Sequence, residues 1–139
     1  MNEEKNVQIV KDGYAHFENG KITNLLELFA NDIDWRTPPV EGSPLPHLCF
    51  GREEVAKFFS QLEKSEALDL FKPTDFIAQG DRVVVLGESK GKAIPTGRNF
   101  ELDWVHIFTL REGKITNFLE FFDTATMQRA YQRASTAQK

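Results

Sequence analysis

The residues best suited to chemistry in this sequence are a histidine, His106, and a glutamate, Glu120. An imidazole and a carboxyl group within reach of each other can accept and donate protons near neutral pH. Both residues lie in the segment 98–125, which is rich in aromatic side chains. A carboxyl group between Phe118 and Phe122 is costly to bury, so its presence there needs a reason. The pair therefore predicts general acid–base catalysis.

The segment 98–125 reads as two strands joined by a tight turn at residues 111–113. In the first strand the even-numbered residues are apolar apart from His106, and this period of two is typical of a strand. A two-residue type I′ turn would put Glu112 at positive φ, whereas a three-residue turn requires only Gly113 there. The three-residue turn predicts the cross-strand pairs Leu110 with Lys114, Trp104 with Glu120, and His106 with Phe118.

This register makes His106 and Glu120 diagonal neighbours on one face of the hairpin. Their backbones would be roughly 7–8 Å apart, and their side chains could meet. A slip of one residue would present Leu119 and Phe121 on that face and remove Glu120 from it. The candidate site therefore depends on the register of the two strands.

The rest of the chain supplies elements that could position this hairpin. Val7, Val10, Tyr14 and Phe17 recur at helical spacing, and Gly20 ends that helix. The same reasoning predicts a second helix over residues 22–29, which stops at 31–32, and a third over 51–62. Strands are predicted over residues 33–37, 70–78 and 82–94, and a tail helix over 124–133.

Residues 38–50 are rich in proline and have almost no periodicity, so we expect a stiff loop. A loop of this length in a small domain is often a lid over a site. We expect it to border the mouth of a cavity and to contribute contacts from Leu45, Leu48 or Phe50.

Helices followed by a run of antiparallel strands predict an α+β fold, with residues 1–139 as a single domain. A curved antiparallel or mixed sheet would wrap around the N-terminal helices as a cone and enclose a cavity. The second face of the late strands is also apolar, because Val105, Ile107, Leu119 and Phe121 point away from His106. We expect a second copy of the chain to cover that face in a homodimer.

Composition excludes several classes of function. The net charge of −4 and the lack of a basic run argue against nucleic-acid binding. A single cysteine, Cys49, excludes an internal disulfide framework, and no apolar run has the length of a membrane span. The opening is too acidic for a signal peptide, so a cytoplasmic protein is expected. With no phosphate-binding loop and no metal-ligand spacing, we expect no cofactor and no metal.

Several stretches together resemble one known family. The opening YAHFENGKITNLLELFANDIDW, the helix GREEVAKFF after a proline-rich loop, and WVHIFTLREGKITNFLEFFDTA look like the SnoaL-like polyketide cyclases. These sit in the wider superfamily of ketosteroid isomerase, scytalone dehydratase, limonene epoxide hydrolase and the nuclear transport factors. The resemblance covers nearly the whole chain, and it implies the fold more specifically than the reaction.

Carried over residue by residue, the resemblance separates two reactions. Thr37 falls where ketosteroid isomerase has its aspartate base, Gly13 where it has its oxyanion tyrosine, and His106 where it has its protonated aspartate. Steroid isomerisation is therefore rejected. The polyketide cyclases have a histidine at the His106 position and an acidic acid/base residue at the Glu120 position, where this chain has the longer glutamate.

The candidate site consists of two groups of residues. We expect Glu120 and His106 to be catalytic, and the following residues to bind a small apolar molecule: Trp35, Thr37, Trp104, Phe118, Phe122, Tyr14 and Phe58. The alternatives are a structural role for His106 with a tyrosine or a backbone group, and an ion pair of Glu120 with Arg36 or Arg98. Asp123 is expected to cap the tail helix. Two functions remain open: a cofactor-free cyclase, isomerase or dehydratase, and a non-catalytic ligand-binding or carrier module.

Overall fold

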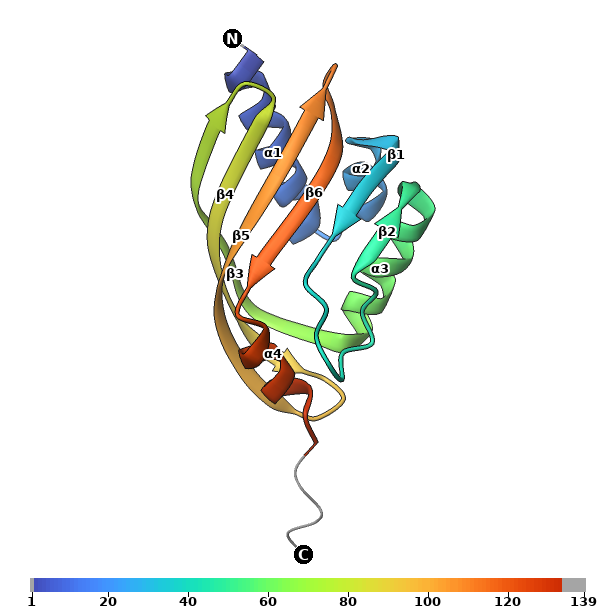
Figure 1. Cartoon of the computed structure of the whole chain (residues 1–139), viewed down its shortest axis with the longest axis vertical. Coiled ribbons are helices and arrows are strands. Elements are labelled where there is room, and N and C mark those ends of the chain that lie inside the picture. The colour runs from blue at the N-terminus through green and yellow to red at the C-terminus, as the bar shows by residue number, and fades with distance from the viewer. Residues whose placement is uncertain (1, 134–139) are drawn as a thin grey trace, which may run out of the picture.

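The structure, a computed structural model, describes residues 2–133 (Figure 1). Its helices are α1 (Asn2–Glu18), α2 (Ile22–Glu27), α3 (Gly51–Ser65) and α4 (Thr124–Tyr131). Its strands are β1 (Phe29–Arg36), β2 (Leu48–Phe50), β3 (Glu66–Gln79), β4 (Arg82–Ala93), β5 (Arg98–Arg111) and β6 (Lys114–Phe122). Within this part of the chain, none of the helices combines the length and the apolar character needed to cross a membrane.

The strands form one six-stranded sheet in the order β2-β1-β6-β5-β4-β3. Strands β1 and β6 are parallel, and the other neighbours are antiparallel. The sheet curls, and α1, α2 and α3 lie on its concave side (Figure 1). The main core lies between these helices and the sheet, with residues such as Val10, Val55 and Val85 almost completely buried. This is the predicted α+β cone.

Several boundaries in the first half of the chain were predicted wrongly. The helix expected to reach residue 29 ends at Glu27, and the strand expected from residue 33 begins at Phe29. Phe29 pairs with Ile115 of β6 and is 1% exposed, so burial against a distant strand overrides the local helical pattern. The end of the predicted loop 38–50 is also a strand, because Cys49 of β2 pairs with Trp35 of β1.

The predicted turn between β5 and β6 was wrong as well. Arg111 pairs with Lys114, so only two residues form the turn. Glu112 has a φ of 50° and Gly113 a φ of 77°, the positive values that a type I′ turn requires at both positions. This turn matches the right-handed twist of long paired strands, which compensates for the unfavourable conformation of Glu112.

A β-bulge then shifts the register of the same hairpin. Leu110 pairs with Ile115 but Thr109 pairs with Asn117, so Thr116 is an extra residue on β6. The Thr116 hydroxyl donates a hydrogen bond to the Thr109 carbonyl at 3.2 Å. Without the bulge, Leu119 would lie opposite His106. With it, the predicted pairing of His106 with Phe118 is replaced by a direct pairing of His106 with Glu120.

The convex face of the sheet carries no helix in Figure 1. Ile77, Val84, Ile107 and Leu119 pair in sequence across β3, β4, β5 and β6 and therefore form one row on this face. Ile77 is 53% exposed, and so is Phe121, which pairs with Val105 nearby. A contiguous apolar surface of this kind is typical of an interface.

We propose that a second copy of the chain packs against this row in a two-fold dimer, because an isologous contact buries the same patch on both copies. Replacing Ile107 with Lys should give monomer or aggregate by light scattering. Ile94, which is 47% exposed just after β4, offers the control Ile94→Lys, which should leave the assembly unchanged. An unaltered dimer in Ile107→Lys would contradict the choice of this face.

Candidate functional site

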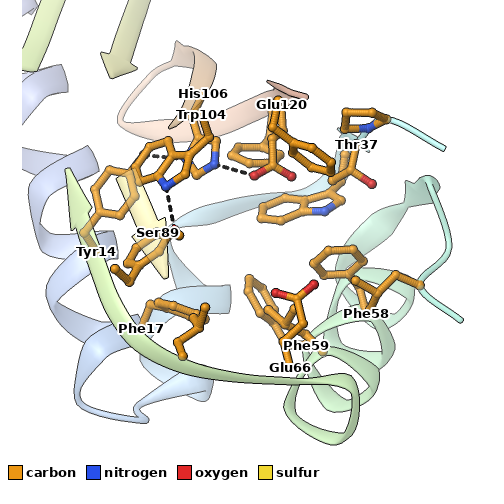
Figure 2. A pocket seen from close by; sticks show the side chains of 18 of the residues that line it. Tyr14, Phe17, Thr37, Phe58, Phe59, Glu66, Ser89, Trp104, His106 and Glu120 are labelled. Carbon is orange, nitrogen blue, oxygen red and sulfur yellow. Dashed lines mark hydrogen bonds and ion pairs between the residues drawn. The ribbon is translucent and has the colours of Figure 1, made fainter. Parts of the chain in front are cut away.

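A cavity of about 140 Å³ lies between the concave face of the sheet and the helices (Figure 2). A single buried water needs roughly 10–15 Å³ on the same measure, so the cavity has room for a small organic molecule. Its wall is mostly aromatic and aliphatic, with contributions from α1, α3, α4 and the strands. Such a lining, with a few polar groups, is typical of ligand sites.

All the residues predicted to act on or bind a ligand line this one cavity: Glu120, His106, Trp35, Thr37, Trp104, Phe118, Phe122, Tyr14 and Phe58. Their binding and catalytic roles remain predictions. The predicted lid segment also lines the cavity, through Leu45 among others. Leu48 and Phe50 instead lie at the surface, at 45% and 53% exposed, because β2 turns their side chains outward.

The polar centre of the cavity is a hydrogen-bonded chain of Tyr14, His106 and Glu120. The Tyr14 hydroxyl lies 2.7 Å from His106 Nδ1, and His106 Nε2 lies 2.8 Å from Glu120 Oε2. The side chain of His106 is 7% exposed and that of Glu120 is 19% exposed. Tyr14 comes from α1, so the chain of contacts joins the first helix to the hairpin. Figure 2 shows the pair on one wall of the cavity.

The partners determine which atom carries each proton. Burial, with a smaller contribution from the negative charge of Glu120, raises the pKa of Tyr14, so its hydroxyl keeps its proton. In the neutral form of His106 that suits both partners, Tyr14 donates to Nδ1 and the ring proton is on Nε2. That N–H donates to Glu120, which accepts it as a carboxylate. The arrangement orients the Glu120 carboxylate and leaves its Oε1 without a hydrogen bond from any described residue.

The alternative ion pairs of Glu120 do not form. Arg36 pairs with Asp34 at 2.8 Å, and the Arg98 guanidinium lies 3.5 Å from the Arg129 carbonyl. Asp123 accepts hydrogen bonds from the backbone N–H groups at the start of α4, which is the predicted cap.

Trp104 forms the wall beside His106. Its ring stacks on the imidazole with centroids 3.9 Å apart, and its Nε1–H donates to Ser89 Oγ at 2.8 Å. The indole lies across β4 at Gly87, its cross-strand partner. A Cβ atom at Gly87 would overlap the indole ring, so only glycine leaves the necessary space.

Replacing Gly87 with Ala should therefore destabilise the protein by about 1–3 kcal/mol, the usual cost of overpacking a core. Chemical denaturation monitored by tryptophan fluorescence measures this loss together with the displacement of Trp104. Lys92→Ala, at an exposed position of the same strand, should change the free energy of unfolding little. Equal stabilities of the two variants would show that Trp104 does not depend on Gly87.

A second carboxyl group in the cavity, Glu66, was not found from the sequence. It is the first residue of β3, and its side chain is half-buried in the cavity wall. Burial and then the negative charge of Glu120 raise its pKa to about 7 from 4.5, while a hydrogen bond from Tyr131 opposes the shift. The Tyr131 hydroxyl lies 3.4 Å from Glu66 Oε2. Near neutral pH, Glu66 is therefore protonated in a large share of molecules.

Glu66 was missed because the strand was predicted to begin at residue 70. In a strand that begins at residue 66, Glu66 and Leu68 share one face and Ala67 and Asp69 the other. The structure shows that Glu66 and Leu68 are on the face that lines the cavity. Ser89 and Tyr131 also line it and were not predicted. Their positions depend on the pairing of β4 with β5 and on the packing of α4, which local sequence does not reveal.

The raised pKa of Glu66 predicts a change of stability with pH. The folded state holds a proton that the unfolded state loses, so this contribution is complete below pH 4.5 and is lost as the pH rises to about 7. Glu66→Gln should therefore become more stable relative to the wild type between pH 4.5 and 8, by about 3 kcal/mol. Urea denaturation across that range measures the difference.

Glu63→Gln, at an exposed position of α3, serves as the control and should differ from the wild type by a small, pH-independent amount. A pH-independent difference for Glu66→Gln as well would show that Glu66 titrates as an ordinary surface glutamate.

Trp35 also faces the cavity with an unused polar group. Its indole stacks on Phe118 with centroids 3.8 Å apart, and the residue is 5% exposed. Its buried Nε1–H has no hydrogen-bond partner among residues 2–133. An unpaired buried donor costs about 1–3 kcal/mol, and a ligand oxygen that accepts a hydrogen bond from it would remove that cost.

The described residues contain no cluster of three or more His, Cys, Asp or Glu side chains arranged for a metal ion.

The fold is therefore of the α+β class, with a cone-shaped sheet that encloses a lined cavity. The chain is a member of the SnoaL-like domain family, whose model matches residues 10–118. The matched part contains His106 and ends just before Glu120.

Three solved structures show the same architecture. An NTF2-like protein from Burkholderia xenovorans LB400 has a TM-score of 0.86 and 36% identity, over 94% of this chain and 98% of that one. An NTF2-like protein of unknown function from Burkholderia pseudomallei K96243 has a TM-score of 0.83 and 30% identity, over 92% and 98%. TerC, co-crystallised with polyporic acid, has a TM-score of 0.78 and 29% identity, over 91% and 98%.

Proposed function

We propose that this protein binds a small, largely apolar carbonyl or polyketide-like compound and catalyses a cofactor-free proton transfer on it, as a cyclase, isomerase or dehydratase does. The observation that carries the proposal is the hydrogen-bonded chain from Tyr14 through His106 to Glu120, which ends at a carboxylate in an aromatic cavity. A carboxylate held in one orientation by a histidine, in a site shielded from water, is suited to general acid–base catalysis.

Each member of the chain has a distinct part in this mechanism. The free Oε1 atom of Glu120 takes a proton from the carbon next to the carbonyl group of the ligand and later returns it to another atom. His106, through its Nε2–H, holds the carboxylate in position. Tyr14 fixes the tautomer of His106 by donating to Nδ1. Rings such as Trp104 and Phe118 exclude water and stack against a planar ligand.

Two further observations support an oxygen-bearing ligand. The unpaired indole N–H of Trp35 offers a donor for a carbonyl or hydroxyl oxygen. The similarity to TerC, which was co-crystallised with polyporic acid, supports the binding of an organic ligand.

A thermal-shift screen of aromatic ketones and lactones should identify ligands, because one present at 100 times its Kd stabilises by about 2.7 kcal/mol. For a ketone that binds, exchange of the hydrogen next to the carbonyl can be followed by NMR in D₂O. Glu120→Gln should retain fold and binding and should lose about 10²–10⁴-fold in exchange rate, because an amide cannot carry the proton. His106→Gln should weaken both affinity and rate.

Glu101→Gln, at an exposed position of β5, is the matched control and should exchange at the wild-type rate. An undiminished rate in Glu120→Gln would contradict the proposed base. A protein that binds these ligands in the wild-type form without any exchange would instead be a carrier or binding module.

A further inference from the structure

The cavity has two carboxyl groups on opposite walls. Figure 2 shows Glu66 pointing into the cavity from the wall that faces the His106–Glu120 pair. Glu66 belongs to β3 at one edge of the sheet, and Glu120 belongs to β6 in its middle. Both line the same cavity, and the charge of Glu120 acts on Glu66. A ligand in the cavity would therefore lie between two carboxyl groups that interact electrostatically.

Glu66, half-buried in the cavity wall, has no cationic partner among the described residues that line the cavity. A buried carboxyl group is normally paired with a cation or with several hydrogen-bond donors. Among the described residues that line the cavity there is no Lys or Arg, and the other titratable groups are Tyr14, His106, Glu120 and Tyr131. Within residues 2–133, one hydrogen bond reaches the Glu66 carboxyl group, from Tyr131 at 3.4 Å, and that hydroxyl also lies 3.3 Å from the Ser65 carbonyl. One long hydrogen bond does not offset the cost of removing the Glu66 carboxyl group from water, so the fold alone does not explain its position.

The surroundings of the two carboxyl groups favour opposite protonation states. Glu120 accepts a hydrogen bond from His106 Nε2–H, as a carboxylate does. Burial and the charge of Glu120 raise the pKa of Glu66 to about 7, so a large share of molecules carry a proton there near neutral pH. Two carboxyl groups that differ in this way across one site are the usual acid and base of an enzyme.

We propose that Glu66 is the proton donor of the site, opposite Glu120 as proton acceptor, and that the substrate is an apolar ketone whose oxygen lies at Glu66 and whose adjacent C–H lies at Glu120. This inference rests on the proposed function and adds the second group and the orientation of the ligand.

The proton transfers balance without any further reactant. The Glu120 carboxylate removes a proton from the carbon next to the carbonyl group, and the electron pair of that C–H bond forms a C=C bond. The electron pair of the C=O π bond takes the proton of Glu66 and becomes an O–H bond. The product is the enol, with Glu120 protonated and Glu66 ionised. The reverse step in D₂O, after Glu120 exchanges its proton with solvent, places deuterium on the carbon.

The first test uses 2-tetralone as the probe and hydrogen exchange in D₂O as the readout. Glu66→Gln keeps the shape of the side chain and can still donate a hydrogen bond, but it cannot deliver a proton. We expect its exchange rate to be lower than that of the wild type by about 10²-fold. The exposed Glu63→Gln of α3 should keep the wild-type rate.

The second test measures the affinity for 2-tetralone without turnover. If the ketone binds only to protonated Glu66, its Kd in the wild type should rise about 30-fold between pH 6 and pH 8.5, in line with the protonated fraction at a pKa of about 7. Tetralin, which lacks the oxygen, should bind without this dependence. Glu66→Gln retains Tyr14, His106, Glu120 and Tyr131, so a flat profile in that variant assigns the effect to Glu66.

The outcomes separate this inference from the proposed function. An undiminished exchange rate in Glu66→Gln, or a pH-dependent affinity that persists in it, would overturn the role of Glu66 and leave Glu120 as the base. Binding by the wild type without exchange would overturn the enzymatic function, and a pH-dependent affinity lost in Glu66→Gln would then still support Glu66 as the donor to the ligand. Wild-type protein that binds neither compound overturns both.

Discussion

The candidate site depends above all on the register between β5 and β6. A two-residue turn at Glu112 and Gly113 would, by itself, place Leu119 opposite His106 and turn Glu120 to the other face. The extra residue Thr116 corrects this by one position, so that the imidazole and the carboxylate meet at 2.8 Å. Bulges often re-aim a side chain in this way near functional sites. The bulge is therefore a requirement of the polar site as well as a feature of the sheet.

Once the pair is formed, the rest of the cavity determines its chemistry. The described lining residues include no lysine or arginine, and the Glu120 carboxylate accepts one hydrogen bond from them, from His106. That charge is felt by Tyr14 and by Glu66, and it raises the pKa of both groups. A single ionised carboxylate in an aromatic cavity thus favours protonated neighbours, which is the condition for proton donation and abstraction in the same site.

The scaffold is shared by proteins whose roles differ, so the fold alone does not assign a reaction. In this chain the core residues position the polar groups of the site. Gly87 leaves room for the Trp104 indole, which stacks on His106, and the pairing of β1 with β6 stacks Trp35 on Phe118. The same aromatic contacts therefore pack the core and position the site, so a change in the core should also affect ligand binding.

Sequence alone determined the features that follow from periodicity and composition: the α+β class, the long strands, and the clustering of His106 and Glu120 with aromatic residues on one face. It could not determine pairings between distant segments. The pentapeptide GKITN occurs at residues 20–24, where it leads into α2, and at residues 113–117, where it leads into β6. The same five residues adopt different structures because one copy packs as a helix and the other pairs with β5. The turn type, the bulge and the approach of Glu66 to the cavity likewise arise from long-range contacts, whose energies exceed local conformational preferences.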